Sequence, residues 1–134
     1  MATMLARIQI KPGCEAAYEE IQSWLHEQTL ANEPTIGRYE FFRGQEPGEY
    51  IGLLSFDDFT TFMVHQTSDY HESFTGRFRE LVEDSSFTWI DPIEGASRLP
   101  PTNAQALPED ASQLARDYEK MLGISVPDWW HERR

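Results

Sequence analysis

The chain has 134 residues, 23 of them acidic and 11 basic, which gives a formal net charge of −12. That length suits one domain with its own core, and the 40% share of hydrophobic residues argues against disorder. The excess of acids would repel a phosphate backbone or an anionic bilayer, so we expect no nucleic-acid and no membrane partner. Cys14 is the only cysteine, no apolar run reaches the roughly 20 residues of a membrane span, and the first residues lack a signal-peptide pattern. We therefore expect a soluble, cytoplasmic protein.

The first half of the chain predicts a strand, a helix and a hairpin. Residues 4–10 alternate in the two-residue period of a strand. A helix should follow and end by about residue 32, because Pro34 cannot continue it. Residues 36–43 and 50–56 are rich in strand-forming types and flank a turn at 45–48. The predicted apolar stripe of the helix consists of Ala17, Ile21, Trp24, Leu25 and Gln28.

The next segment predicts two helices and a fourth strand. Asp57 or Asp58 can cap a short helix, and Ser68 can cap a longer one. Residues 86–90 then read as a strand closed by Pro92 and Gly95. The apolar positions are Phe59, Phe62 and Met63 in the short helix, and Tyr70, Phe74, Phe78, Leu81 and Val82 in the longer one.

This order of elements predicts an α+β fold of the ferredoxin-like type, βαββαβ, with an antiparallel sheet. The helices of such a fold cover one face of the sheet. The strands nevertheless carry large apolar side chains on both faces, since Leu5 opposes Met4 and Leu53 opposes Leu54. Leaving several such groups in water is costly, so we expect a second copy of the sheet to cover the open face.

We divide the chain into a domain at 1–94 and an extension at 95–134. The first part holds 17 acidic and 6 basic residues (net −11), and the second holds 6 and 5 (net −1). Residues 95–108 resemble a linker, residues 109–122 a helix that ends with Gly123 at C′, and Trp129 and Trp130 form an aromatic tail. The extension should dock on its own core or on a neighbouring subunit.

A polar run at residues 65–72, between the two apolar helical stripes, holds the best candidates for chemistry. His65, with Tyr70 close by, could take a proton in a cleft with aromatic walls that suits a flat, apolar ligand. A structural explanation exists for each residue as well, because a histidine at a helix break can be a cap and Tyr70 can belong to the core.

The usual signatures of cofactors are missing from the sequence. His65, Asp69, His71 and Glu72 could be imagined around a metal, but the helix break at Ser68 disrupts their spacing, so we expect no metal site. No Gly-rich phosphate loop and no GxSxG motif is present either. We expect no nucleotide or flavin cofactor and no serine triad.

Three stretches resemble the antibiotic biosynthesis monooxygenase family of dimeric α/β barrels. They are residues 6–13 (ARIQIKPG), residues 37–42 (GRYEFF), and the spaced set Phe56, Phe62, His65, Ser68 and Tyr70. The resemblance runs from about residue 5 to residue 90. It implies a homodimer with two sheets face to face and a pocket between sheet and helices in each subunit.

Members of this family oxidise anthrone-like or quinol-like phenols with O2 and no cofactor, so the resemblance implies that activity here. His65 falls on the histidine position of the family and Tyr70 on the aromatic position that follows, which makes them the catalytic candidates. The candidates for substrate binding are Arg7, Phe62, His71, Phe74 and Trp89.

Two departures from related patterns bear on this interpretation. The haem-degrading branch uses an Asn in the first strand, a Trp where His65 stands and a histidine near Thr75, so the residues here argue against haem. The extension is absent from short members of the family. It could form a lid over the pocket, bind across the dimer or recruit a partner. A non-catalytic protein of the same fold, binding a small ligand or acting as a dimeric interaction module, remains the alternative.

Overall fold

The computed structural model describes residues 1–134, and its elements follow the predicted order. Four strands form one antiparallel sheet in the order β2-β3-β1-β4, which confirms the ferredoxin-like α+β fold. The elements are β1 (Ala2–Ile10), α1 (Glu15–Asn32), β2 (Arg38–Arg43), β3 (Glu49–Phe56), α2 (Phe59–Gln66), α3 (Asp69–Leu81), β4 (Val82–Trp89), α4 (Gln113–Leu122) and α5 (Asp128–His131).

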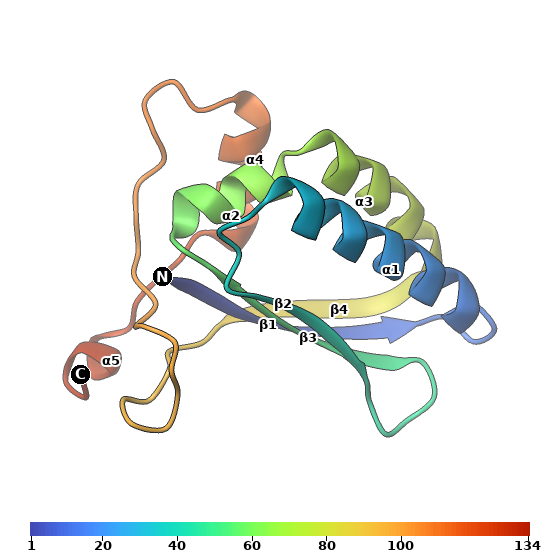
Figure 1. Cartoon of the computed structure of the whole chain (residues 1–134), viewed down its shortest axis with the longest axis horizontal. Coiled ribbons are helices and arrows are strands. Elements are labelled where there is room, and N and C mark those ends of the chain that lie inside the picture. The colour runs from blue at the N-terminus through green and yellow to red at the C-terminus, as the bar shows by residue number, and fades with distance from the viewer.

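Helices α1, α2 and α3 cover one face of the sheet and leave the other bare (Figure 1). Alternation along β1 buries Met4, Ala6 and Ile8 beneath the helices. On the bare face, Leu5 pairs with Leu53 of β3 and both stay half-buried.

Both predicted helix caps are present and together set the path of the chain through α2 and α3. The Asp58 carboxylate accepts a hydrogen bond from the backbone N–H of Thr61 at 2.7 Å, and Ser68 Oγ accepts one from the N–H of His71 at 3.3 Å. The Ser68 hydroxyl also donates to the carbonyl of His65 at 2.7 Å. These bonds fix the break between α2 and α3 at residues 67–68.

Two predictions about helix α1 and strand β4 were wrong in detail. The buried face of α1 is rotated from the predicted stripe, because Ala17 is exposed and the polar Gln22 and Thr29 are buried. Strand β4 begins at Val82, four residues before the predicted start, because the end of β1 offers it a partner in Ile10. Val82 therefore belongs to the strand and not to the stripe of α3.

The extension also differs from its prediction in where its helices lie. Helix α4 begins after Ser112, whose hydroxyl accepts from the N–H of Ala115, and not at residue 109. Gly123 ends α4 with a φ of −59°, so it is a C-cap without the left-handed conformation of a C′ glycine. The tail folds into the short helix α5, where Trp129 is 62% exposed and packs against Trp130.

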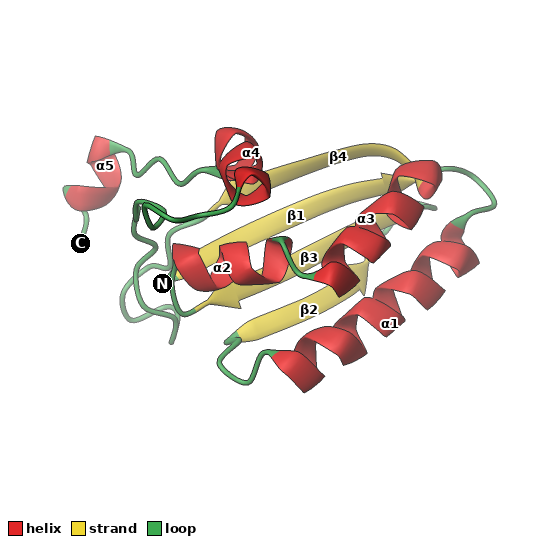
Figure 2. Ribbon diagram, turned by 90° about the horizontal axis from the view of Figure 1, so that it is seen from above, coloured by secondary structure: helices red, strands yellow, loops and turns green.

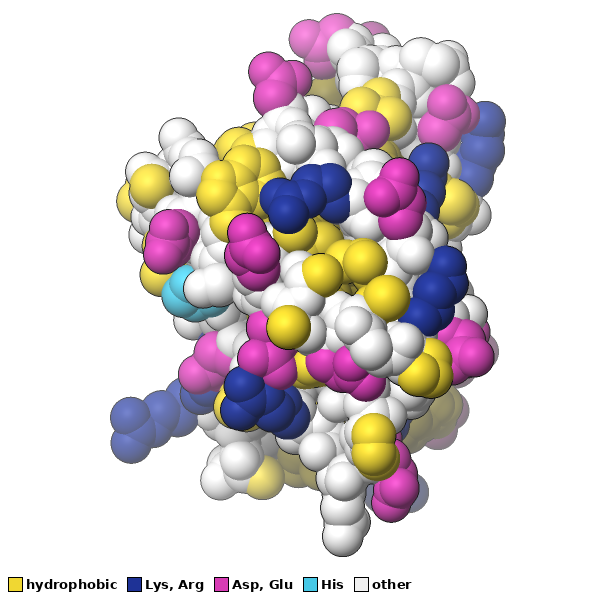
Figure 3. Space-filling view, turned by 90° about the vertical axis from the view of Figure 1, so that its right-hand side faces the viewer, with side chains coloured by type: hydrophobic (Ala, Val, Ile, Leu, Met, Phe, Trp, Pro, Cys, Tyr) yellow, Lys and Arg dark blue, Asp and Glu magenta, His cyan; other side chains and the backbone are white.

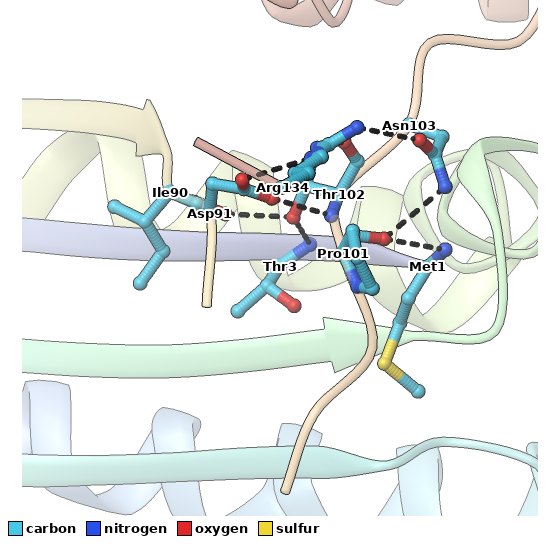
Figure 4. Close-up of polar contacts among 8 residues, drawn as sticks. All are labelled: Met1, Thr3, Ile90, Asp91, Pro101, Thr102, Asn103 and Arg134. Carbon is cyan, nitrogen blue, oxygen red and sulfur yellow. Dashed lines mark hydrogen bonds and ion pairs between the residues drawn. The ribbon is translucent and has the colours of Figure 1, made fainter. Parts of the chain in front are cut away.

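A set of polar contacts, which we call the clasp, fastens the extension to the edge of β1 (Figure 4). It consists of Thr3, Ile90, Asp91, Thr102 and Arg134. The buried Thr102 hydroxyl accepts from the Thr3 N–H at 3.2 Å and donates to the Ile90 carbonyl at 2.6 Å. Arg134 donates two hydrogen bonds to the Asp91 carboxylate, at 2.7 and 3.0 Å, and this ion pair lowers the pKa of Asp91.

Charged side chains of both signs lie on the end of the molecule that faces the viewer in Figure 3. Figure 3 shows acidic groups interspersed with Lys, Arg and apolar groups over one end of the molecule. No helix of the chain combines the length and apolar character that crossing a bilayer requires.

Candidate functional site

Three helix ends meet over the sheet and bring distant residues together. Glu33 is the C-cap of α1, His65 lies in the last turn of α2, and Tyr70 lies in the first turn of α3. Pro34 ends α1 and the Ser68 cap ends α2, so both turns are dictated locally. The convergence makes one polar cluster inside an apolar shell.

The centre of the cluster is a buried hydrogen bond between His65 and Glu33. His65 Nδ1 lies 2.7 Å from Glu33 Oε1, and the two side chains are 1% and 6% exposed. When Glu33 is ionised it can only accept, and the donor of this bond is then Nδ1–H. The second ring nitrogen, Nε2, makes no hydrogen bond within the chain. In this tautomer Nε2 is a free proton acceptor.

Tyr70 completes the cluster by donating its hydroxyl to the same Glu33 oxygen. Burial, together with the hydrogen bond to Glu33, raises the pKa of Tyr70 to about 12. Tyr70 is therefore a neutral donor near pH 7. The other carboxylate oxygen, Glu33 Oε2, is buried without a partner, which leaves this carboxylate only partly compensated.

A second imidazole, His71, lies against His65. The ring centroids are 4.9 Å apart, and His71 is 8% exposed. Burial, reinforced by the nearby His65, lowers the pKa of His71 to about 3. His71 is thus neutral near pH 7 and adds no positive charge beside His65.

A cavity of about 500 Å³ between the sheet and the helices reaches both histidines. Fifteen of its 23 lining residues are hydrophobic, and the size and composition are those of sites for small organic ligands. The predicted site residues that line it are Phe62, His65, His71 and Phe74.

Three of the predicted site residues do not line this cavity. Arg7 pairs with Ile51 and Ser86 on the bare face of the sheet, because strand alternation turns it away from the helices. Assigning Arg7 to a pocket between sheet and helices was therefore wrong. Trp89 packs on Phe62 and donates its indole N–H to the Leu122 carbonyl at 2.8 Å. It therefore contacts two residues of the cavity wall without lining the cavity itself. Tyr70 donates to Glu33, and its ring lies edge-on to His65 with the centroids 6.3 Å apart, but it does not line the cavity.

Sequence reasoning missed Glu33, the residue that links His65 and Tyr70. It belongs to no motif, and its partners lie 32 and 37 residues further along the chain. The signal in the sequence was only a carboxylate directly before the proline that ends a helix. Tyr118 of α4 was also missed; it lines the cavity and donates to Glu72.

A second hollow, of about 520 Å³, lies between α1 and the edge strand β2. It is an open groove in which only four of the ten lining residues are hydrophobic. Its Glu19 is already paired, since it accepts from Arg43 at 2.6 and 2.7 Å and from Tyr50 at 2.8 Å, whereas Gln22 Nε2 is buried without a partner. We therefore place the candidate site in the cavity at His65. No three His, Cys, Asp or Glu side chains gather closely enough to hold a metal ion.

Comparison with known proteins identifies the family. The family model of the antibiotic biosynthesis monooxygenases matches residues 1–77. Three solved structures are similar to this chain. The first is an antibiotic biosynthesis monooxygenase, and the other two are described as candidate antibiotic biosynthesis monooxygenases, from Caulobacter crescentus and from Bacteroides thetaiotaomicron. Their sequence identities are 20%, 21% and 16%, and their TM-scores are 0.64, 0.66 and 0.67.

The shared fold covers 69%, 69% and 73% of this chain, and 99%, 90% and 94% of those three chains. No curated protein is detectably similar in sequence. The fold, the matched segment and the solved structures agree, and the chain belongs to the antibiotic biosynthesis monooxygenase family.

Proposed function

We propose that this protein is a cofactor-independent monooxygenase that oxidises an aromatic phenol, quinol or anthrone in the cavity at His65. The observation that carries the proposal is the buried Glu33–His65 pair, which leaves Nε2 as the free nitrogen of an imidazole that lines an apolar cavity. A carboxylate bound to Nδ1 holds the ring in place and stabilises the imidazolium that forms when Nε2 takes a proton.

The reaction needs no electron source other than the substrate. His65 removes the proton that converts the substrate to its phenolate or enolate. That anion passes one electron to O2, and the resulting radical and superoxide combine to form a C–O bond. The His65 imidazolium returns its proton to the resulting peroxide anion. The anthrone hydroperoxide then loses water to give the quinone, so one oxygen atom enters the product and the other leaves as water. The burial of His65, which is 1% exposed, limits its contact with water and strengthens the electrostatic effect of the base.

The test is O2 uptake with dithranol, a dihydroxyanthrone, in His65→Ala and in His131→Ala as a control on the exposed tail. We expect His65→Ala to lose at least about 10²-fold in rate, the low end for a general base, and His131→Ala to match the wild type. Equal rates in all three proteins would refute the role of His65.

The apolar lining of the cavity also supports the alternative function, a non-catalytic binder of small aromatic ligands. Wild-type protein that binds dithranol without accelerating its oxidation would establish that alternative.

We also propose a homodimer formed through the bare face of the sheet. Leu5, Ile51 and Leu53 lie there half-buried, and Phe42 is 51% exposed with no covering element. Light scattering should give twice the chain mass for the wild type and for Val64→Arg, which places a charge on the helical side. Leu53→Arg should give a monomer, and a dimeric Leu53→Arg would contradict this interface.

A further inference from the structure

Helix α4 supplies part of the wall of the cavity. It lies beside α2, toward the β4 edge of the sheet (Figure 2). Tyr118, Met121 and Leu122 of α4 line the same cavity as His65 and His71. Tyr118 is 6% exposed, whereas Met121 is 68% exposed, so the first belongs to the inner wall and the second to the rim.

Specific contacts hold α4 in this position. The Tyr118 hydroxyl donates to Glu72 on α3, and the Tyr118 ring lies edge-on to His71 with the centroids 6.4 Å apart. At the other end of α4, the Leu122 carbonyl accepts from the Trp89 indole at 2.8 Å. The clasp anchors the connecting segment to β1 at Thr102. The helix is therefore tied to α3, to β4 and, through its linker, to the centre of the sheet.

This wall lies outside the segment that the family model matches. The family match ends at residue 77, and the three similar structures correspond to 69–73% of this chain while being covered almost completely themselves. Residues 113–122 thus shape the cavity from beyond the segment that the family model matches.

We propose that α4 determines specificity: Tyr118 and Met121 set the size of the aromatic ligand that the cavity accepts. The inference rests on the proposed function, because it concerns the ligand of the same site. We expect a ligand with three fused rings, bound at His65, to reach the rim at Met121, and a one-ring phenol to occupy only the inner part of the cavity. Bulk added at the rim should therefore exclude the larger ligand selectively.

The experiment compares Met121→Trp with Leu114→Trp. Leu114 lies two turns earlier on the same face of α4, is 38% exposed and does not line the cavity. Because Met121 is exposed, the new indole should not disturb folding. Binding of dithranol and of hydroquinone is measured without O2, by equilibrium dialysis, so that the result does not depend on turnover.

We expect Met121→Trp to weaken dithranol binding at least about 10-fold, the scale on which a filled pocket discriminates by size. Hydroquinone binding should change by less than about twofold, and Leu114→Trp should change neither. Unchanged dithranol binding in Met121→Trp, or an equal loss in Leu114→Trp, would overturn the inference and leave the proposed function intact. Wild-type protein that binds neither ligand would instead overturn the proposed function.

A measurement without any ligand tests the wall separately. The ionisable groups that face His71 are His65 on α2 and Tyr118 on α4, with Glu72 behind Tyr118. If α4 closes the cavity, Tyr118→Ala should admit water to His71, and its pKa, followed by NMR, should rise from about 3 toward its ordinary value of 6.5. A His71 that titrates as in the wild type would show that α4 does not close the cavity.

Discussion

Replacing Glu33 by Gln separates the proposed role of this carboxylate in catalysis from its contribution to stability. The amide has the same shape and can still accept from His65 Nδ1 and the Tyr70 hydroxyl, but it has no charge to stabilise an imidazolium. A hydrogen bond to a charged group contributes about 1.5–3 kcal/mol, and one between neutral groups about 0.5–1.5 kcal/mol. The difference of about 1.5 kcal/mol corresponds to a rate at least about tenfold lower.

The stability of Glu33→Gln should change in a different way. Glu33 Oε2 is buried without a partner, so this oxygen loses its hydration on folding and forms no hydrogen bond that compensates for the loss. Neutralising a charge in such a place costs little, and we expect the free energy of unfolding to stay within about 1 kcal/mol of the wild type.

The assays are O2 uptake with dithranol and urea unfolding, with Glu27→Gln, an exposed residue of the same helix, as the control. The ¹⁵N chemical shifts of the His65 ring report its tautomer without any substrate. An unchanged rate in Glu33→Gln would refute the reasoning. So would a loss of more than about 2 kcal/mol in stability with a normal rate per folded molecule, since the carboxylate would then be structural.

Two further changes test the electrostatics and the extension. Because folding lowers the pKa of His71 from 6.5 to about 3, the unfolded chain binds more protons between these pH values, and the free energy of unfolding falls as the pH drops below 6.5. His71→Phe should remove about 2 kcal/mol of this loss between pH 6.5 and about pH 5. An equal dependence of the unfolding free energy on pH in the two proteins would contradict the assignment. Thr102→Val leaves the Thr3 N–H and the Ile90 carbonyl without their partner, so the free energy of unfolding in urea should fall by about 2–4 kcal/mol. The control is Ser97→Ala at an exposed position of the same segment. An equal loss in Ser97→Ala would show that the clasp is not the cause.

Local signals predicted most of the fold. Asp58 and Ser68 cap the helices they were expected to cap, and the alternation at residues 4–10 predicted a strand where the structure has β1. The errors lie where a tertiary partner decides. The period of α3 continues through Val82, yet Val82 pairs with Ile10 and starts a strand.

The candidate site was predictable only in part for the same reason. His65 and His71 were found from their own short segment, and the structure places both on the cavity. Glu33 contacts His65 and Tyr70 only because the end of α1 lies against α2 and α3 in the fold. Arg7 does not line the cavity, because strand alternation turns it to the bare face of the sheet. The spacing of residues along the chain predicts neither the contacts of Glu33 nor the position of Arg7.

The clasp has a consequence for the order in which the protein folds. β1 precedes the other three strands in the chain, yet it lies in the middle of the sheet. Thr3 pairs with Ser55 on one side and donates its N–H to Thr102 on the other, 52 and 99 residues away. Contacts across such separations close large loops and form slowly. During synthesis, the N–H of Thr3 therefore lacks its Thr102 partner until residue 102 has left the ribosome, and the clasp is among the last contacts to form.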